Sequence, residues 1–257
     1  MNPQPGRIIY LSPPTPVNMS EWYYDIANLE HFWVRRRFDV LRRLAGPVLR
    51  QAKHAAEIGC GNGVVQRNLE DSYGLSVAGF ELIEAALEKS VSRHSPLYCY
   101  NIHQRHAPFR AHFDMLLMFD VLEHIEDESA FLQSVKFHLA PSGTLLINVP
   151  AHPFLFSAYD RAAGHCRRYS RDALARVVEQ NGFRIRAITY WGLPLAPLLL
   201  ARKIVAAMRR SEQQAYSSGF DPGPPLVNRL LALLARCEPL PQQWFGTSVM
   251  AVLENQP

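Results

Sequence analysis

The chain has 257 residues, of which 48% are hydrophobic and 19% charged, a composition typical of one globular catalytic domain and not of a disordered or fibrous chain. The formal net charge is +4, an excess too small to indicate nucleic-acid binding. The four cysteines are scattered without metal-type pairing, so we expect reduced thiols and no metal. The N-terminus lacks the apolar run of a secretory signal, which predicts a cytoplasmic protein.

The first 50 residues are expected to form a helical cap ahead of the main fold. After a proline-rich lead, apolar residues recur at helical spacing, namely Trp22, Ile26, Leu29 and Trp33. Ser20 is a plausible N-cap and Gly46-Pro47 a plausible stop. Residues 21–45 therefore predict one long helix or two short ones.

Residues 51–191 alternate between strand and helix patterns at the spacing of βα units. Strands are predicted at 55–58, 76–80, 97–100, 113–119, 144–149 and 184–191, with a final strand at 245–253 within the C-terminal segment 243–257. Helices are predicted at 64–71, at 83–92, from about 131 to 139 and at 170–180. The alternation predicts a doubly wound α/β fold, with a mainly parallel sheet and helices on both faces.

Residues 192–242 are expected to form a helical insertion before the last strand. Two apolar segments, 193–208 and 226–237, fit an ordinary cover over a substrate. The most apolar window, residues 191–201, is too short to cross a bilayer, which takes roughly 20 apolar residues. Because the first segment ends in Arg209-Arg210, an alternative is peripheral contact of 193–210 with an anionic membrane surface, which would admit a lipid-linked acceptor.

A glycine-rich loop, Glu57-Ile58-Gly59-Cys60-Gly61-Asn62-Gly63, lies between a predicted strand and a predicted helix. Such glycines let backbone amides approach a nucleotide-like ligand. The spacing G-x-G-x-G differs from the dinucleotide pattern G-x-G-x-x-G, and no P-loop lysine follows it. The Glu57 carboxylate would repel a pyrophosphate, but it suits the ammonium and sulfonium groups of S-adenosylmethionine.

Glu81 follows the next strand, where a carboxylate can accept both ribose hydroxyls of a nucleotide. Taken alone, the three glycines could merely make a tight turn. The full series of strand, acid, loop, helix, strand and second acid favours a bound cofactor.

Residues 55–191 resemble the class I S-adenosylmethionine-dependent methyltransferases, and within them the bacterial group that includes ubiquinone-biosynthesis O-methyltransferases. The resembling motifs are Glu57 to Gly63, Phe80-Glu81, Phe113-Asp114 through Asp120-Val121-Leu122-Glu123-His124, and Pro141-Ser142-Gly143-Thr144-Leu145. The resemblance implies a seven-stranded sheet whose last strand is antiparallel.

The same resemblance implies a role for each cofactor residue. Glu57 and Gly59, in the loop with Cys60, Gly61 and Gly63, would contact the amino-acid part of S-adenosylmethionine. Glu81 would bind the ribose, and Asp120 with Val121 the methionine side. Asn101-Ile102 stands where the family commonly has an aspartate and a small residue near adenine, and an amide can also hydrogen-bond that ring.

Methyl transfer from a sulfonium is an in-line displacement, so the protein mainly positions the nucleophile, and a general base helps when the acceptor is a hydroxyl. Candidates lie in the long loop after the strand at 144–149. His165 is a candidate base, or else it bonds a neighbouring carboxylate such as Asp160. His124 and Tyr169 are further catalytic candidates, although His124 could simply pack beside the cofactor.

Four residues of the same loop are predicted to bind substrate: Arg167, Arg168, His152 and Tyr159. The arginines could recognise a phosphate or carboxylate, or they could form a salt bridge that pins the loop. The sequence thus predicts a methyltransferase that acts on oxygen in a small or lipid-linked metabolite. A nicotinamide-dependent oxidoreductase and a non-catalytic S-adenosylmethionine-binding protein are the alternatives.

Overall fold

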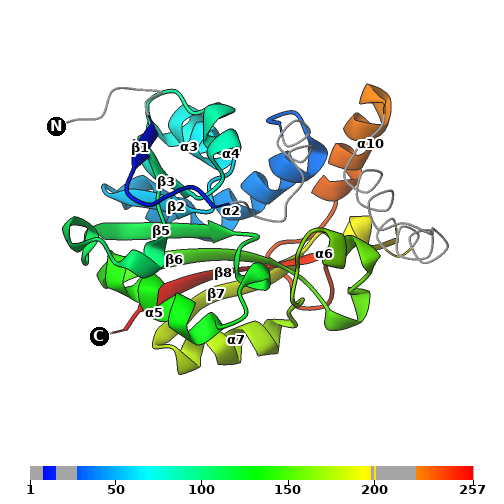
Figure 1. Ribbon diagram of the computed structural model, residues 1–257. Coiled ribbons are helices and arrows are strands. Elements are labelled where there is room, and N and C mark those ends of the chain that lie inside the picture. Colours follow the sequence, from blue (N-terminus) through cyan, green and yellow to red (C-terminus); the bar gives the residue numbers. More distant parts are fainter. Residues whose placement is uncertain (1–7, 16–27, 198–199, 201–223, 257) are drawn as a thin grey trace.

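The computed structural model describes residues 8–15, 28–197, 200 and 224–256 (Figure 1). Within them, eight strands form one sheet in the order β1-β4-β3-β2-β5-β6-β8-β7. The strands are β1 (Ile8–Tyr10), β2 (Ala55–Ile58), β3 (Val77–Glu81), β4 (Leu97–Cys99), β5 (Phe113–Phe119), β6 (Leu139–Pro150), β7 (Phe183–Trp191) and β8 (Ser248–Asn255). Neighbouring strands from β1 to β6 are parallel, whereas β8 lies antiparallel between β6 and β7.

The predicted mainly parallel sheet with an antiparallel last strand is confirmed, but the expected number of seven strands is wrong. The additional strand is β1, which pairs in parallel with β4 at the edge of the sheet. It lies in the N-terminal region where only a helical cap was expected. Three residues are too few for a period-two pattern to reveal a strand.

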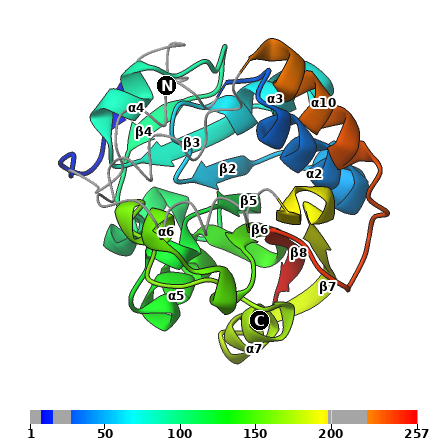
Figure 2. The same cartoon turned by 90° about the vertical axis from the view of Figure 1, so that its right-hand side faces the viewer.

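Helices cover both faces of the sheet, as a doubly wound fold requires (Figure 2). They are α2 (Phe32–Gln51), α3 (Val64–Tyr73), α4 (Glu84–Glu88), α5 (Glu128–His138), α6 (Ala158–Ala162), α7 (Arg171–Gln180) and α10 (Pro225–Arg236). Along β5, Leu116 and Met118 pack with residues of α5 and α7, while Met115 and Leu117 pack with residues of α2 and α3. This alternation makes β5 a central strand with two buried faces.

Several predicted element bounds are wrong: the helix expected at 83–92 spans only Glu84–Glu88, and the final strand, expected at 245–253, is Ser248–Asn255. Two further differences have a clear physical cause. Helix α2 continues through Pro47 to Gln51, because Leu49 is buried against the sheet and extends the apolar stripe beyond the proline. Strand β6 begins at Leu139, which pairs with Phe113, five residues before the predicted start at 144. In both cases tertiary pairing overrides a local stop signal.

The start of the first predicted helix is only partly described. Helix α2 begins at Phe32, and the Nδ1 atom of the N-cap His31 accepts a hydrogen bond from the Trp33 amide at 3.2 Å. Residues 16–27, which include the expected N-cap Ser20, lie outside the described residues.

The segment expected to form a helical insertion is described at its two ends, by the short 3-10 helix η5 (Leu193–Leu195) and by α10. Helix α10 packs against α2, and the side chain of Asn228 accepts from the Phe32 amide at 2.9 Å. Most of 193–210, the expected membrane-contact segment, lies outside the described residues. Among the helices that are described, none is both long and apolar enough to cross a membrane.

Candidate active site

Three acidic residues gather at the carboxyl ends of adjacent strands. Glu57 lies near the end of β2, Glu81 ends β3, and Asp120 directly follows β5. Because β3, β2 and β5 are parallel neighbours, their carboxyl ends share one edge of the sheet. In open α/β sheets this edge is where ligands bind.

The glycine loop joins β2 to α3 through left-handed backbone. Gly59, Gly61 and Gly63 have φ values of 70°, 53° and 75°, which favour glycine. A Cβ on Gly59 would lie only 2.5 Å from Cγ2 of Val121, and one on Gly63 would lie 2.6 Å from a serine oxygen. The glycines therefore allow the loop to turn tightly and to lie against the segment that follows β5.

Glu57 is a buried acid without a complete set of partners. Its side chain is 2% exposed, and its Oε2 atom has no hydrogen-bond partner within the described part of the chain. Burial raises the pKa of Glu57 to about 8, the Arg37 charge opposes that rise, and Glu81 and Asp120 add to it. A buried polar atom of this kind calls for a partner, and a cationic ligand would provide one.

Glu81, in contrast, is fixed by backbone amides. Its Oε2 accepts from the Gly61 amide at 3.0 Å, and its Oε1 accepts from the Leu82 and Ile83 amides at 2.7 and 3.0 Å. Burial raises the pKa of Glu81, and these three hydrogen bonds oppose the rise. The carboxylate thus holds the glycine loop in place, and it retains lone pairs for a ligand hydroxyl.

Asp120 belongs to a polar network that reaches across the fold. Arg37 of α2 donates to its Oδ2 at 2.6 Å, and Asn148 of β6 donates to its Oδ1 at 2.8 Å. Trp191 in turn donates to Asn148 at 2.8 Å. Asp120 itself has a φ of 57°, an uncommon value for a residue other than glycine, and it is held there by these partners.

The expected adenine pair has a defined local role. Asn101 caps the short 3-10 helix η1 (Ile102–Gln104), because its side-chain oxygen accepts from the His103 amide at 3.0 Å. Ile102 is buried in the core. Cys60 is buried in the glycine loop, where a Cβ on Gly79 would approach its sulfur at 2.7 Å.

The loop between β6 and α7 contains the predicted catalytic histidine. Nδ1 of His165 lies 3.0 Å from Oδ1 of Asp160. The predicted contact between His165 and a neighbouring carboxylate is therefore present, and the role of His165 as a base stays a prediction. Arg168 also donates to this Oδ1, at 2.7 Å, and to the Ala151 carbonyl at 3.2 Å. Although burial opposes ionisation, the hydrogen bond from His165 and the Arg168 charge lower the pKa of Asp160 to about 2.

Tyr169 and Arg167 meet on one acid of α5. The Tyr169 hydroxyl donates to Oε1 of Glu128 at 2.5 Å, and Arg167 pairs with Oε2 at 2.5 Å. Burial and the Glu128 hydrogen bond raise the pKa of Tyr169. Arg167 and Arg168 therefore both form ion pairs that hold the loop in place, with Glu128 and Asp160. A substrate role for the two arginines stays a prediction.

Of the remaining predicted substrate residues, His152 lies in an aromatic stack. Its ring is stacked on Phe245 at 4.2 Å and on Tyr190 at 4.8 Å. Phe154, 60% exposed, lies next to His152. Tyr159 is buried on α6 and packs with Ala163.

Glu123 and His124 lie in the short 3-10 helix η3 (Leu122–His124) after β5. Burial lowers the pKa of His124 to about 4, and it raises the pKa of Glu123 well above its usual range. The His124 and His165 rings meet edge to face at 4.8 Å. The structure thus brings two of the predicted catalytic residues together, whereas Tyr169 is directed to Glu128.

A model of the methyltransferase domain family matches residues 28–188, more than half of the chain. The chain belongs to this family. The predicted methyltransferase, with S-adenosylmethionine as its cofactor, is confirmed at the level of the family. The narrower resemblance to ubiquinone-biosynthesis O-methyltransferases stays a prediction.

The similar proteins are distant from this methyltransferase domain. A probable S-adenosylmethionine-dependent methyltransferase of Mycobacterium tuberculosis is 26% identical over 159 residues, which cover 61% of this chain and 57% of the relative. The match thus spans little more than half of that curated relative.

Two solved structures share the fold at low identity. Phosphoethanolamine N-methyltransferase 2 of Haemonchus contortus, in complex with S-adenosyl-L-methionine, has a TM-score of 0.58 at 14% identity, over 93% of this chain and 58% of that one. The [4+2]-cyclase SpnF has a TM-score of 0.59 at 12% identity, over 95% and 99% of the two chains. The same fold therefore occurs in proteins with different names and reactions, and the site must decide the chemistry.

Sequence reasoning missed Arg37 and Asn148, which donate to Asp120, and Trp191, which donates to Asn148. Their patterns indicate only a helix face and buried strands, so no local signal distinguishes them. Glu123 could have been found, because it stands in the motif from Asp120 to His124.

Proposed function

We propose that this protein transfers the methyl group of S-adenosylmethionine to an oxygen of a small or lipid-linked acceptor. The observation that carries the proposal is Glu57, a buried acid with an unpartnered oxygen beside the glycine loop. This acidic side chain supplies no positive charge for the phosphates of a dinucleotide, and its ionised form would repel them. The ammonium of S-adenosylmethionine would instead supply the missing hydrogen-bond donor and charge.

The other residues of the edge fit the rest of that cofactor. Gly59 leaves room where a Cβ would clash, so backbone can approach the ligand closely. Glu81 is already oriented by three amides and would accept the ribose hydroxyls. Asp120 with Val121 would contact the methionine side, and Asn101 with Ile102 would contact adenine.

When bound, S-adenosylmethionine supplies a methyl group activated by the sulfonium. The protein must then orient an acceptor oxygen in line with the carbon–sulfur bond and accept its proton. His165 is suited to this step, because its Nδ1 is engaged by Asp160 and its Nε2 is left as the basic atom. The acceptor oxygen would attack the methyl carbon, and S-adenosylhomocysteine would leave as a neutral thioether.

The surroundings of the loop support an apolar or planar acceptor. His152 and Phe245 form a flat stack with the exposed Phe154 beside it, and Tyr159 lies on the same loop. Such aromatic surfaces bind apolar groups. Arg167 is the more exposed of the two arginines and could attract an acidic group of the acceptor.

Two measurements test the proposal. Isothermal titration calorimetry should show binding of S-adenosylmethionine and S-adenosylhomocysteine, strong weakening in Glu57→Gln, and no comparable binding of nicotinamide dinucleotides. Formation of S-adenosylhomocysteine in the presence of hydroxylated acceptors, with and without anionic liposomes, then tests turnover and membrane presentation. Tighter binding of a dinucleotide would contradict the assignment, and cofactor binding without turnover across such acceptors would favour a non-catalytic protein.

A further inference from the structure

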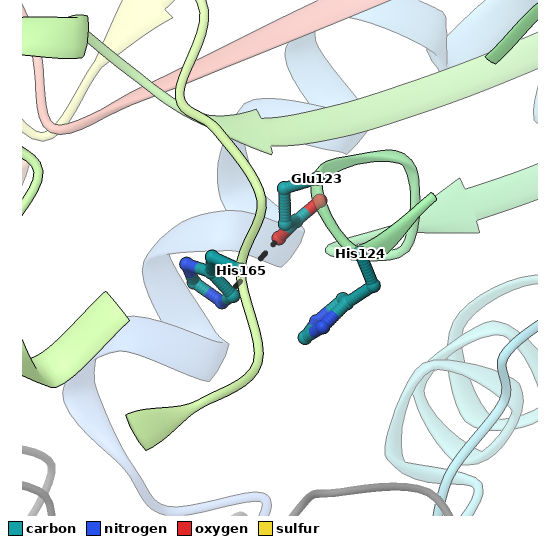
Figure 3. A group of neighbouring side chains, drawn as sticks. All are labelled: Glu123, His124 and His165. Atoms are coloured by element: carbon teal, nitrogen blue, oxygen red, sulfur yellow. Dashed lines mark ion pairs between the residues drawn. The ribbon is translucent and has the colours of Figure 1, made fainter. Parts of the chain in front are cut away.

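We propose that Glu123, His124 and His165 bind a divalent transition-metal ion beside the methyl-transfer site. One ligand-capable atom from each of the three side chains lies within 4.8 Å of the other two (Figure 3). The scattered cysteines led us to expect no metal, but this group contains no cysteine. The inference rests on the proposed function for its chemical role, while the binding of the ion can be measured independently.

Two loops are held together at this point. Glu123 and His124 follow β5, and His165 lies between α6 and α7. The Cys166 amide donates to the Glu123 carbonyl at 2.8 Å, which fixes the loops next to each other. The ligands therefore come from a braced framework rather than from one exposed loop.

Both histidines have the tautomer that metal binding needs. Nδ1 of His124 lies 3.2 Å from the Gly164 carbonyl, which can only accept, so Nδ1 carries the proton. Nδ1 of His165 lies 3.0 Å from the Asp160 carboxylate, which accepts in the same way. When neutral, each ring then has its lone pair on Nε2, and an oxygen partner on the opposite nitrogen is the usual second contact of a metal-binding histidine.

The environment of Glu123 indicates a bound cation independently of the spacing of the three side chains. It is 0% exposed, yet neither of its carboxylate oxygens has a hydrogen-bond partner in the described part of the chain. Oε1 faces Nε2 of His165 at 4.0 Å, beyond hydrogen-bond distance. A carboxylate that is buried and unpartnered is costly, and a bound cation would compensate for that cost.

The spacing suits a metal after a small adjustment. Metal bonds of about 2.1 Å place two ligands at most about 4.2 Å apart, so the widest pair must close by less than about 1 Å. Two imidazoles and one carboxylate favour Zn²⁺, Fe²⁺ or similar ions, and three protein ligands leave at least one position open.

The proposed ligand Glu123 follows Asp120 by three residues, and Asp120 would contact the methionine side of the cofactor. The ion would therefore lie beside that part of the proposed cofactor site. An acceptor hydroxyl in the open position would bind through oxygen and lose its proton to water more easily. That oxygen would form the new bond to the methyl carbon as the carbon–sulfur bond breaks. The neutral histidines would then act as ligands, and the ion would do the work otherwise assigned to a general base.

The test uses the full chain, treated with a chelator and titrated with Co²⁺ and Zn²⁺. We expect one ion per chain by calorimetry, and Co²⁺ absorption bands typical of a low-coordinate nitrogen and oxygen site. Glu123→Gln keeps the side-chain shape and should weaken binding at least 10-fold. His112→Ala is the matched control, because the exposed His54 and His112 rings, 5.1 Å apart, are an alternative surface site.

If Glu123→Gln does not fold by circular dichroism, His165→Ala serves as the second ligand variant. Binding as tight in the ligand variant as in the native chain would overturn the proposal, as would loss of binding in His112→Ala or no binding by the native chain. S-adenosylmethionine binding by the same chelator-treated protein separates the two proposals. Cofactor binding without Co²⁺ binding rejects only the metal site, and Co²⁺ binding without cofactor binding rejects only the proposed function.

Discussion

Binding of S-adenosylmethionine should strengthen as pH rises, because Glu57 must lose a proton to pair with the cofactor ammonium. Burial, partly offset by Arg37, raises the pKa of Glu57 to about 8, so the free protein holds this carboxyl mostly protonated at neutral pH. Only the ionised fraction is ready to bind a cation, and the apparent affinity is reduced by that fraction.

The magnitude follows from the ionised fraction. A carboxyl with a pKa of about 8 is about 1% ionised at pH 6.0 and about 24% ionised at pH 7.5. The ionised fraction thus rises about 24-fold, while a cofactor amine with a pKa near 7.7–8.0 loses about a quarter to two fifths of its charge by pH 7.5. The dissociation constant should therefore fall about 15- to 18-fold over this interval. At pH 6.5 close to one proton should be released for each cofactor bound.

Calorimetry in buffers of different ionisation enthalpy measures both the affinity and the released proton. Glu57→Gln is the control: it should bind weakly, without the slope that Glu57 causes. A dissociation constant that is the same at pH 6.0 and 7.5, together with a binding enthalpy independent of the buffer, would refute the assignment of Glu57 to the ammonium.

The same variant should be more stable than the native protein without cofactor. At pH 7 the unfolded Glu57, with its ordinary pKa of 4.5, is ionised, whereas the folded one holds a proton. Taking up that proton costs on the order of 3 kcal/mol, and glutamine avoids the cost. The free energy of unfolding of the native protein should accordingly fall as pH rises from about 4.5 to about 8, whereas Glu57→Gln should not show this part of the decrease. Denaturant titration of both proteins at several pH values would show the difference.

Three further substitutions, one of them paired with a control, test the framework of the site and its proposed base. In Gly59→Ala, left-handed backbone strain adds to a contact of 2.5 Å, so the free energy of unfolding should fall by about 3 kcal/mol or more. Gly74→Ala is its control: it has the strain but no atom within 4 Å, so the free energy of unfolding should fall by only about 1–2 kcal/mol. Thermal unfolding of both variants measures the difference. Arg37→Leu leaves Asp120 without its buried cation, so the free energy of unfolding should fall by about 3 kcal/mol and cofactor binding should weaken. His165→Ala should lower kcat by about 100-fold or more while the cofactor dissociation constant stays nearly constant; full activity would remove His165 from the chemistry.

Sequence patterns located the strands that carry the site because those strands are short, fully buried runs between turn signals. The bounds of β2 and β5 were predicted to the residue, and their order then places Glu57 and Asp120 at one edge. The partner of Asp120 could not be predicted in this way. Arg37 lies 83 residues earlier, on a helix whose pattern indicates only which face is buried.

The loop after β6 shows the same limit at shorter range. The pairing of His165 with Asp160 could be anticipated because the two are five residues apart. Its approach to Glu123, 42 residues earlier, depends on how two loops cross the end of the sheet, a relation that no periodicity records. Local spacing therefore predicted the histidine but not the cluster to which it belongs.

The other buried acids of this chain show that it can satisfy a carboxylate where only structure is required. Glu70 accepts from three consecutive amides of residues 93–95, and Glu238 accepts from Arg36 and from two amides after β7. Glu57 and Glu123 are equally buried, yet each keeps carboxylate oxygen without a partner in the described part of the chain. Both lie at the carboxyl edge, one on β2 and the other just after the adjacent β5. Within the described part of the chain, the buried carboxylate oxygens that lack a partner all belong to these two residues of the ligand-binding edge. Cations that arrive with ligands explain this best: an ammonium at Glu57 and a metal ion at Glu123.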